Sequence, residues 1–269
     1  MSTATPRGDF AAISSSGLEN PYETERLLSE YLLFHYGTAE ETLPFEEGPA
    51  SGLGYPIRCV SECVDASALS AGARALDLGC AVGRSSFELA RVCEEVVGID
   101  YSNSFIAAAD EIRSRGSLAY SRRDEGDLHS SLVARRPEGV SPERVCFEQG
   151  DAMQLREGLG QFDVVLLANL IDRLSDPSAC LDALGALVRN GGQLVVTSPY
   201  TWMEEYTPRS NWLGGVHRGA DSKKTLEGLR GALERHFELI RTKDLPFLIR
   251  EHARKYQWSM AQASIWRRR

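Results

Sequence analysis

The chain has 269 residues, of which 42% are hydrophobic and 25% are charged. This balance is ordinary for a globular protein and leaves enough apolar surface for a core, so disorder of the whole chain is excluded. The net charge of −8 argues against a phosphate backbone as the main partner, because nucleic-acid-binding surfaces gather excess Lys and Arg. A small molecule is the expected ligand, with neither nucleic acid nor a membrane as partner.

The six cysteines form no C-x-x-C pair and have no histidine at zinc-ligand spacing, which indicates reduced thiols and no metal site. No apolar run approaches the roughly 18 residues of a membrane span, and residues 1–20 lack the apolar segment of a signal peptide. These observations predict a cytoplasmic protein. Because residues 1–20 are mostly small and polar, they are expected to form a disordered tail.

Residues 21–269 are expected to form one domain that begins with a helical cap over 21–70. Apolar residues recur at helical spacing in Tyr22–Tyr36, which is followed by a glycine suited to end a helix. The stretch 37–56 is rich in Gly, Pro and Glu and predicts a loop. A second helix is expected at Ile57–Ala68, leading into the core.

Strands and helices alternate from residue 73 onward. Short apolar runs predict strands at Ala73–Leu78, Glu95–Ile99, Arg144–Gln149, Phe162–Ala168 and Gln193–Thr197. Helical spacing predicts helices at Ser85–Val92, Ser102–Arg113, Asp176–Val188 and Leu226–Arg235. Because this alternation implies parallel strands joined by crossover helices, it predicts an α/β, Rossmann-like fold.

Two segments depart from the alternation. The last two strands, Phe237–Asp244 and Tyr256–Trp266, are expected to pair antiparallel across 245–254. The result is a mostly parallel seven-stranded sheet with an antiparallel C-terminal strand and an N-terminal helical addition. The polar segment 116–143 shows no clear periodicity and predicts an insertion placed to reach the substrate.

A glycine loop, Asp77-Leu78-Gly79-Cys80-Ala81-Val82-Gly83, joins the first strand to its helix. Glycine lets the backbone approach a ligand, and ligands of parallel sheets bind beyond the carboxyl ends of the strands. A Walker A loop would end in Gly-Lys-Ser/Thr, whereas here Gly83 is followed by Arg84. A dinucleotide fingerprint needs a third glycine. The loop therefore supports neither a nucleoside triphosphate nor a nicotinamide cofactor.

The spacing Asp77-x-Gly79-x-x-x-Gly83 instead resembles motif I of class I S-adenosylmethionine-dependent methyltransferases. In that family the methionine part of the cofactor lies along this loop. The resemblance implies the class I methyltransferase fold. It also implies that Asp77, Gly79, Cys80, Ala81 and Gly83 bind S-adenosylmethionine, which becomes S-adenosylhomocysteine.

Acidic residues at the ends of the next two strands fit the same cofactor. Asp100, followed by Tyr101, is placed to accept hydrogen bonds from both ribose hydroxyls. Asp151 resembles the family's acceptor for the adenine amino group, with Ala152 and Met153 lining the ring. An isolated Gly-Asp pair is more often a surface turn, so the weight of Asp151 comes from its register with the other strand ends.

Longer runs make the resemblance narrower. The runs Tyr22 to Thr24, Tyr31 to Gly37, Asn169 to Leu174, Ser198 to Trp202 and Pro246 to His252 look like the ovothiol-pathway methyltransferase family. That family methylates the π nitrogen of the imidazole of 5-thiohistidine, giving ovothiol A. The match extends from residue 22 to the C-terminus and departs mainly in segment 116–143. It implies a functional link to a sulfoxide synthase that supplies the thiohistidine.

The resemblance also indicates the substrate side of the site. In such methyltransferases the end of the fourth strand faces the transferable methyl group, which implies that Asn169 contacts both cofactor and substrate. His35, Asp172 and Tyr22 are the catalytic candidates, because they can accept, orient or hydrogen-bond the ring proton. Each has a plain alternative role in helix capping or packing.

Further side chains suit an amino acid that carries a ring and a sulfur atom. Aromatic groups can wall the imidazole, and an arginine can bind the carboxylate through two hydrogen bonds. The expected substrate contacts are Tyr22, Asn169, Asp172, Tyr200, Trp202, Tyr206 and Arg250, with Arg254 as an alternative to Arg250.

Three other interpretations stay open: a methyltransferase for another small molecule such as a phenol or an amine, a nicotinamide oxidoreductase, and a catalytically silent cofactor-binding partner. Direct transfer without a metal is expected, because the sulfonium is already an activated methyl donor. The protein then has to hold the reacting atoms in line and exclude water.

Overall fold

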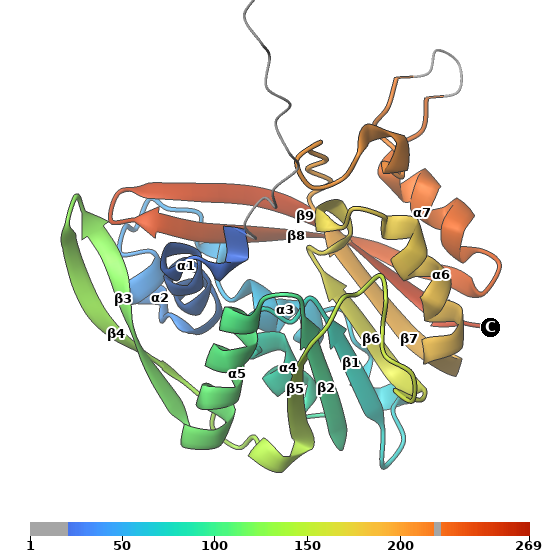
Figure 1. Ribbon diagram of the computed structural model, residues 1–269, viewed down its shortest axis with the longest axis horizontal. Coiled ribbons are helices and arrows are strands. Elements are labelled where there is room, and N and C mark those ends of the chain that lie inside the picture. The colour runs from blue at the N-terminus through green and yellow to red at the C-terminus, as the bar shows by residue number, and fades with distance from the viewer. Residues whose placement is uncertain (1–20, 218–221) are drawn as a thin grey trace, which may run out of the picture.

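A seven-stranded sheet forms the centre of the protein (Figure 1). The computed structural model describes residues 21–217 and 222–269, so the tail predicted for 1–20 lies outside the described residues. The strands of this sheet are β1 Arg74–Leu78, β2 Glu95–Asp100, β5 Val145–Gln149, β6 Phe162–Ala168, β7 Val188–Ser198, β8 Phe237–His252 and β9 Lys255–Arg268. Their order across the sheet is β5-β2-β1-β6-β7-β9-β8.

The directions of the strands agree with the predicted fold. Strand β1 pairs in parallel with β2 and β6, β2 pairs in parallel with β5, and β6 pairs in parallel with β7. Strand β9 runs antiparallel to both of its neighbours, β7 and β8. The prediction of a mostly parallel, Rossmann-like sheet with an antiparallel C-terminal strand is therefore confirmed.

Both faces of the sheet are covered, as the continuous apolar runs in its strands require. Along β1, Ala75 belongs to one core cluster, whereas Leu76 and Leu78 belong to the other. The first cluster includes residues of the helices α3 Tyr55–Ser61, α4 Arg84–Leu89 and α5 Asn103–Arg115. The second includes residues of α6 Pro177–Leu187 and α7 Thr225–Leu233. Among the described helices, none has the length and apolar character needed to cross a membrane.

Short helices precede the first strand. They are η1 Pro21–Glu23, α1 Glu25–Tyr36, α2 Ala39–Thr42, η2 Ala50–Gly52, α3 and η3 Ala66–Ala68. The Thr24 hydroxyl caps α1 by accepting a hydrogen bond from the Leu27 N–H at 3.4 Å. The helix predicted for Ile57–Ala68 is shorter, because α3 ends at Ser61 and Asp65 starts a separate turn. Leu32 of α1 is buried in the core, which anchors this cap.

The segment predicted as an irregular insertion, 116–143, contains a hairpin. Its strands, β3 Ser117–Glu125 and β4 Leu128–Arg135, form a separate two-stranded antiparallel sheet. Leu118 and Tyr120 pack against the core, while Ala119 between them is exposed. The sequence does not predict this hairpin, because β3 is mostly polar and neither strand shows a sustained alternation of apolar residues.

The final hairpin is longer than predicted. Residues 245–254, expected to separate two strands, mostly belong to β8, and the chain turns only at Ala253 and Arg254. Pro246 argues against a strand when only the sequence is considered, but β8 lies at the edge of the sheet, where proline is tolerated. Strand β9 pairs with β7 only from Gln262 to Arg267. The rest of the hairpin therefore extends beyond the sheet and over α1 (Figure 1).

Arg250 joins this projecting hairpin to two other parts of the chain. Its guanidinium donates hydrogen bonds to the carbonyl oxygen of Glu41 at 2.6 Å and to that of Ala253 at 3.4 Å. Arg122 of β3 donates to the same Glu41 carbonyl at 3.2 Å. The Ala253 N–H donates to the carbonyl of Asp124 at 3.1 Å. The two hairpins and α2 thus form a connected layer beside α1.

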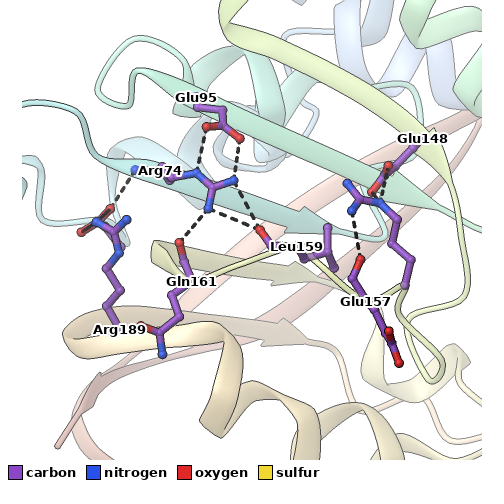
Figure 2. A network of polar contacts seen from close by, with 9 residues as sticks. Arg74, Glu95, Glu148, Glu157, Leu159, Gln161 and Arg189 are labelled. Carbon is purple, nitrogen blue, oxygen red and sulfur yellow. Dashed lines mark hydrogen bonds and ion pairs between the residues drawn. The ribbon is translucent and has the colours of Figure 1, made fainter.

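A polar network lies at the opposite end of the sheet, where the parallel strands begin (Figure 2). The Arg74 guanidinium donates to the Glu95 carboxylate at 2.6 and 2.8 Å and to the carbonyls of Leu159 and Gln161. The backbone N–H of Arg74 donates to Asp163, which also pairs with Arg189. This network ties the starts of β1, β2 and β6 together.

Candidate active site

A cavity of about 730 Å³ opens beyond the carboxyl ends of β1, β2, β5 and β6, where ligands of parallel sheets bind. The structure brings most of the predicted cofactor residues to its wall. They are Gly79, Cys80, Ala81, Asp100, Tyr101, Asp151, Ala152, Met153 and Asn169. Two predicted residues, Asp77 and Gly83, do not line it.

Asp77 lies beneath the glycine loop. It is 1% exposed, and its Oδ2 accepts a hydrogen bond from the Ser86 hydroxyl at 2.7 Å. Its Oδ1 has no hydrogen-bond partner within 21–217 and 222–269. Burial, with the nearby charge of Asp100, raises the pKa of Asp77 to about 7. Asp77 therefore holds the start of α4 and does not reach the cavity, contrary to the prediction of direct contact.

The loop itself is held in left-handed backbone conformations. The φ angles are +73° at Gly79, +48° at Ala81 and +87° at Gly83. A Cβ atom at Gly83 would lie 2.4 Å from Phe147 Cζ, so this glycine is required for close packing and for its backbone angle. At Ala81 the conformation is strained for a residue with a side chain, and such strain is typical of ligand sites.

Asp100 stabilises the strained loop from the end of β2. Its Oδ2 accepts a hydrogen bond from the Ala81 N–H, and its Oδ1 accepts one from the Ser102 N–H, both at 2.9 Å. Burial raises the pKa of Asp100, and these two N–H groups act in the opposite direction. A carboxylate has about four acceptor positions. Asp100 can therefore hold the loop and still accept two ligand hydroxyls.

Asp151 and Met153 form another part of the wall at the end of β5. The Asp151 carboxylate accepts a hydrogen bond from the Met153 N–H at 2.8 Å. The Met153 sulfur accepts contacts at 3.3 Å from the Ser175 hydroxyl and the Asp176 N–H. These contacts fix the thioether, and a polarizable side chain of this kind suits a flat aromatic ring.

Asn169 follows β6 with a φ of +53°, a conformation that Asn tolerates better than most residues. Its Oδ1 accepts a hydrogen bond from the Tyr55 hydroxyl at 2.7 Å, and its N–H donates to the Thr197 carbonyl at 2.9 Å. The amide is thus fixed at the cavity wall. Tyr55, on α3, also lines the cavity and was not identified from the sequence.

The N-terminal segment supplies an aromatic wall. Tyr22 lines the cavity together with Tyr31, Phe34 and His35. The Tyr31 ring lies 6.0 Å from that of Tyr22 and 4.8 Å from that of Phe105. Burial raises the pKa of Tyr22 to about 12, although Arg173 lowers it. The Tyr22 phenol therefore stays protonated at neutral pH and can serve as a hydrogen-bond donor.

His35 presents a neutral imidazole to the cavity. Burial, together with the positive charge of Arg84, lowers the pKa of His35 to about 3. Its Nδ1 is buried and has no hydrogen-bond partner in the described part of the chain. Such a ring is too weak a base to take a proton at neutral pH, but it can form a hydrogen bond with a ligand. The low pKa disfavours the predicted role of His35 as a proton acceptor, and its role in orienting the substrate ring stays a prediction.

Asp172 does not line the cavity, contrary to its predicted catalytic and substrate contacts. It is fully buried, and its carboxylate accepts hydrogen bonds from the Ser198 hydroxyl and the Thr201 N–H, both at 3.0 Å. Its neighbour Arg173 reaches the cavity instead. The cause is the 3₁₀ turn Ile171–Arg173, in which successive side chains point about 120° apart.

Three of the other predicted substrate residues also lie outside the cavity wall. The Tyr200 hydroxyl donates to Gln262 at 3.0 Å, and the Trp202 indole donates to Thr225 at 2.9 Å. Arg250 is 4% exposed, and its guanidinium donates hydrogen bonds to backbone carbonyls. Tyr206 does line the cavity.

Several lining residues were not predicted. They include Tyr31, Phe34, Tyr55, Phe105, Arg173, Glu205 and Ile249. Some lie within sequence runs that carry the family resemblance, but only the folded chain shows which side chains face the ligand. In the described ranges no group of three or more His, Cys, Asp or Glu side chains is arranged to hold a metal ion.

A family model described as a methyltransferase domain matches residues 69–263. The chain belongs to this family. The match includes the glycine loop and the ends of β2, β5 and β6, which form the floor of the cavity. The predicted enzyme class, a methyltransferase that uses S-adenosylmethionine, is therefore confirmed.

Curated relatives match only part of this chain. A ubiquinone biosynthesis O-methyltransferase from Azorhizobium caulinodans is 28% identical over 127 residues, 47% of this chain and 40% of the relative. One from Cupriavidus pinatubonensis is 31% identical over 137 residues, 50% of this chain and 45% of the relative. The chain thus spans less than half the length of these relatives.

Solved structures of methyltransferases are also similar. An S-adenosylmethionine-dependent methyltransferase from Methanosarcina mazei is 18% identical, with 75% of this chain and 94% of that chain covered and a TM-score of 0.49. The N-methyltransferase NodS from Bradyrhizobium japonicum is 16% identical, with 73% and 85% covered and a TM-score of 0.45.

Proposed function

We propose that this protein transfers the methyl group of S-adenosylmethionine to the π nitrogen of the imidazole of 5-thiohistidine, giving ovothiol A. The sequence runs around Tyr31–Gly37 and Asn169–Leu174 support the substrate through their resemblance to the ovothiol-pathway family. Within the structure, the supporting observation is a cavity whose aromatic wall is joined by a positively charged side chain, Arg173.

The cofactor would occupy the floor of the cavity. Asp100 would accept the ribose hydroxyls, and Asp151 would accept from the adenine amino group, with Met153 against the ring. The methionine part would lie along Gly79–Ala81. A cofactor bound in this way would present its methyl group toward the end of β6, where Asn169 accepts a hydrogen bond from Tyr55.

The substrate ring would lie between the cofactor and the aromatic wall. In the transfer, the lone pair of the π nitrogen forms a bond to the methyl carbon, and the carbon–sulfur bond breaks with its electron pair on sulfur. The product imidazolium then loses a proton to solvent. An imidazole without its sulfur titrates near pH 6.5, so the ring is largely neutral at neutral pH, and the tautomer with its proton on the τ nitrogen leaves the lone pair of the π nitrogen free to attack. His35 and Tyr22 orient the ring by hydrogen bonds, and rate comes from alignment and exclusion of water.

A sulfoxide synthase is the functional partner that we propose, because the 5-thiohistidine has to be made by sulfur transfer to histidine before it can be methylated. A second candidate activity is O-methylation of a phenol, since curated relatives are named ubiquinone biosynthesis O-methyltransferases. A phenol lacks the carboxylate that would make use of Arg173.

The test is incubation of the purified protein with S-adenosylmethionine and, separately, 5-thiohistidine, histidine and a catechol. We expect 5-thiohistidine to gain the mass of one methyl group. Histidine should react at least ~100-fold more slowly, because a site that pairs with the sulfur leaves its polar groups unpaired when the sulfur is absent. Methylation of the catechol without methylation of 5-thiohistidine would favour the second candidate.

A further inference from the structure

Arg173 brings a guanidinium to the cavity wall beside two phenols. Its Cζ lies 4.9 Å from the centre of the Tyr206 ring, and it also interacts with Tyr22. The Arg173 side chain is 26% exposed, so its charge is partly removed from water. A guanidinium in such a place attracts an anion more strongly than one on an open surface.

The hydrogen bonds of Arg173 to Asp172 and Thr201 all come from one nitrogen, and a further hydrogen bond joins its side chain to the Tyr22 phenol. Nη1 donates to the Asp172 carbonyl at 2.8 Å, to the Asp172 carboxylate at 3.1 Å and to the Thr201 carbonyl at 3.0 Å. A guanidinium has five N–H donors on three nitrogens in a rigid fork, a geometry that matches a carboxylate. Anchoring one nitrogen orients the plane of the fork at the cavity wall.

Asp172 is well placed to set this orientation. Its carboxylate is itself held by the Ser198 hydroxyl and the Thr201 N–H, at the end of β7 and in the segment that follows. The ion pair with Arg173 therefore connects the ends of β6 and β7 to the cavity. Glu205 lines the same cavity and is exposed, so both signs of charge face the ligand space.

We propose that Arg173 binds the carboxylate of the methyl acceptor and selects an amino acid over the corresponding decarboxylated amine, with Asp172 as the positioning residue that orients Arg173. This inference rests on the proposed function, because it concerns the substrate of the same cavity. Opposite charges in one cavity suit a zwitterion, whose ammonium group would be directed toward Glu205.

The experiment compares 5-thiohistidine with its decarboxylated amine, 5-thiohistamine, in the full-length enzyme. We expect the wild type to prefer the amino acid by at least ~30-fold in kcat/KM. Arg173→Met keeps the apolar stem and removes the fork, so KM for the amino acid should rise at least ~30-fold, with kcat/KM for the amine changed less than about threefold. Arg173→Lys keeps a charge without the fork, so its KM for the amino acid should lie between those of the wild type and Arg173→Met.

Two controls separate this role from others. Arg209 lies over the Trp212 ring at 5.3 Å and pairs with Glu204, in the same surface segment but away from the cavity wall. Arg209→Met should behave as the wild type with both acceptors. Asp172→Asn should raise KM for the amino acid and leave the amine unaffected, a selective change that a purely structural role would not produce.

Other outcomes would overturn the proposal. One is a wild type with equal kcat/KM for the two acceptors. Another is an Arg173→Met variant whose kcat/KM falls equally for both acceptors. A third is an Arg173→Met variant whose affinity for S-adenosylmethionine falls by the same factor as its affinity for the amino acid. If the wild type methylates neither acceptor, the proposed function fails. Calorimetry with S-adenosylhomocysteine-loaded protein then decides the inference alone: tighter binding of L-histidine than of histamine, lost in Arg173→Met, supports it, and equal or absent binding refutes it.

Discussion

The Asp100 carboxylate has two tasks at one place, since it holds the Ala81 and Ser102 N–H groups and faces the cavity. We expect Asp100→Ala to weaken S-adenosylmethionine binding by at least ~2 kcal/mol, about 30-fold, because two ribose hydroxyls lose their acceptor. Calorimetry measures this loss. Asp182→Ala, on the exposed side of α6, is the control for an acidic residue far from the cavity.

A ligand comparison separates ribose binding from a disturbed loop. Wild-type protein should bind S-adenosylhomocysteine more tightly than its 2′-deoxyribose analogue, and the Asp100→Ala variant should lose this preference. If the variant discriminates between the two ligands as well as the wild type, Asp100 does not bind the ribose.

His35 gives the protein a pH-dependent stability. Its folded pKa is lowered to about 3, while an unfolded imidazole titrates near 6.5. Between these values the unfolded chain binds a proton that the folded chain excludes, so the contribution of His35 to stability is complete above pH 6.5 and falls as the pH drops below it. We expect His35→Gln to lose less thermal stability than the wild type on going from pH 7.5 to pH 5.

Melting temperatures across this range provide the test. His129 lies exposed on β4, so His129→Gln should follow the wild-type curve. Parallel curves for wild type and His35→Gln would show that His35 does not carry the effect. Because the ring is already neutral, His35→Gln should also leave the shape of the pH–rate profile unchanged.

At the scale of elements, the Arg74 network fixes the starts of three strands without touching the cavity (Figure 2). Arg74→Met should lower the free energy of unfolding by ~1–2 kcal/mol, because it removes an ion pair and leaves backbone carbonyls with fewer partners. Urea unfolding measures the change, and S-adenosylmethionine affinity should stay the same. The matched control is Arg115→Met, since the ion pair of Arg115 with Glu111 is 75% and 38% exposed and should contribute less than ~0.5 kcal/mol. Equal losses in the two variants would contradict the special role of Arg74.

How well a strand can be predicted from the sequence depends on which of its faces are exposed to water. The run Phe162–Ala168 matches β6 residue for residue, because a strand buried on both faces is almost continuously apolar, here with the single exception of Asp163. The β3–β4 hairpin has one half-buried and one exposed face, and its polar side chains leave no such signal. Strand ends could be located from the turns that follow them, so Asp100 and Asp151 were found.

Side-chain direction was not predictable in the same way. Whether Asp172 or Arg173 faces the ligand depends on the phase of one 3₁₀ turn. The position of Arg250 depends on the contact between α2 and the last hairpin, and a contact between segments so far apart in the chain leaves no local sequence pattern.

At the scale of the whole molecule, Arg250 acts on the layer formed by α2 and the two hairpins. Arg250→Met should lower the free energy of unfolding by ~2–3 kcal/mol, because partly buried carbonyls lose a charged donor. The KM for the methyl acceptor should change little. Denaturation and steady-state kinetics test this together, with the neighbouring exposed Arg254→Met as control. A tenfold rise in KM with unchanged stability would instead restore the substrate role first expected for Arg250.

The position of β9 between β7 and β8 has a consequence for synthesis on the ribosome. Strand β8 leaves the ribosome before β9, yet it can join the sheet only through β9. Until β9 forms, one edge of β7 is unpaired, and this strand carries the apolar residues Leu194 and Val196. Such an edge can pair with another chain. A nascent chain that stops after β8 would therefore tend toward aggregation rather than toward a partly active enzyme.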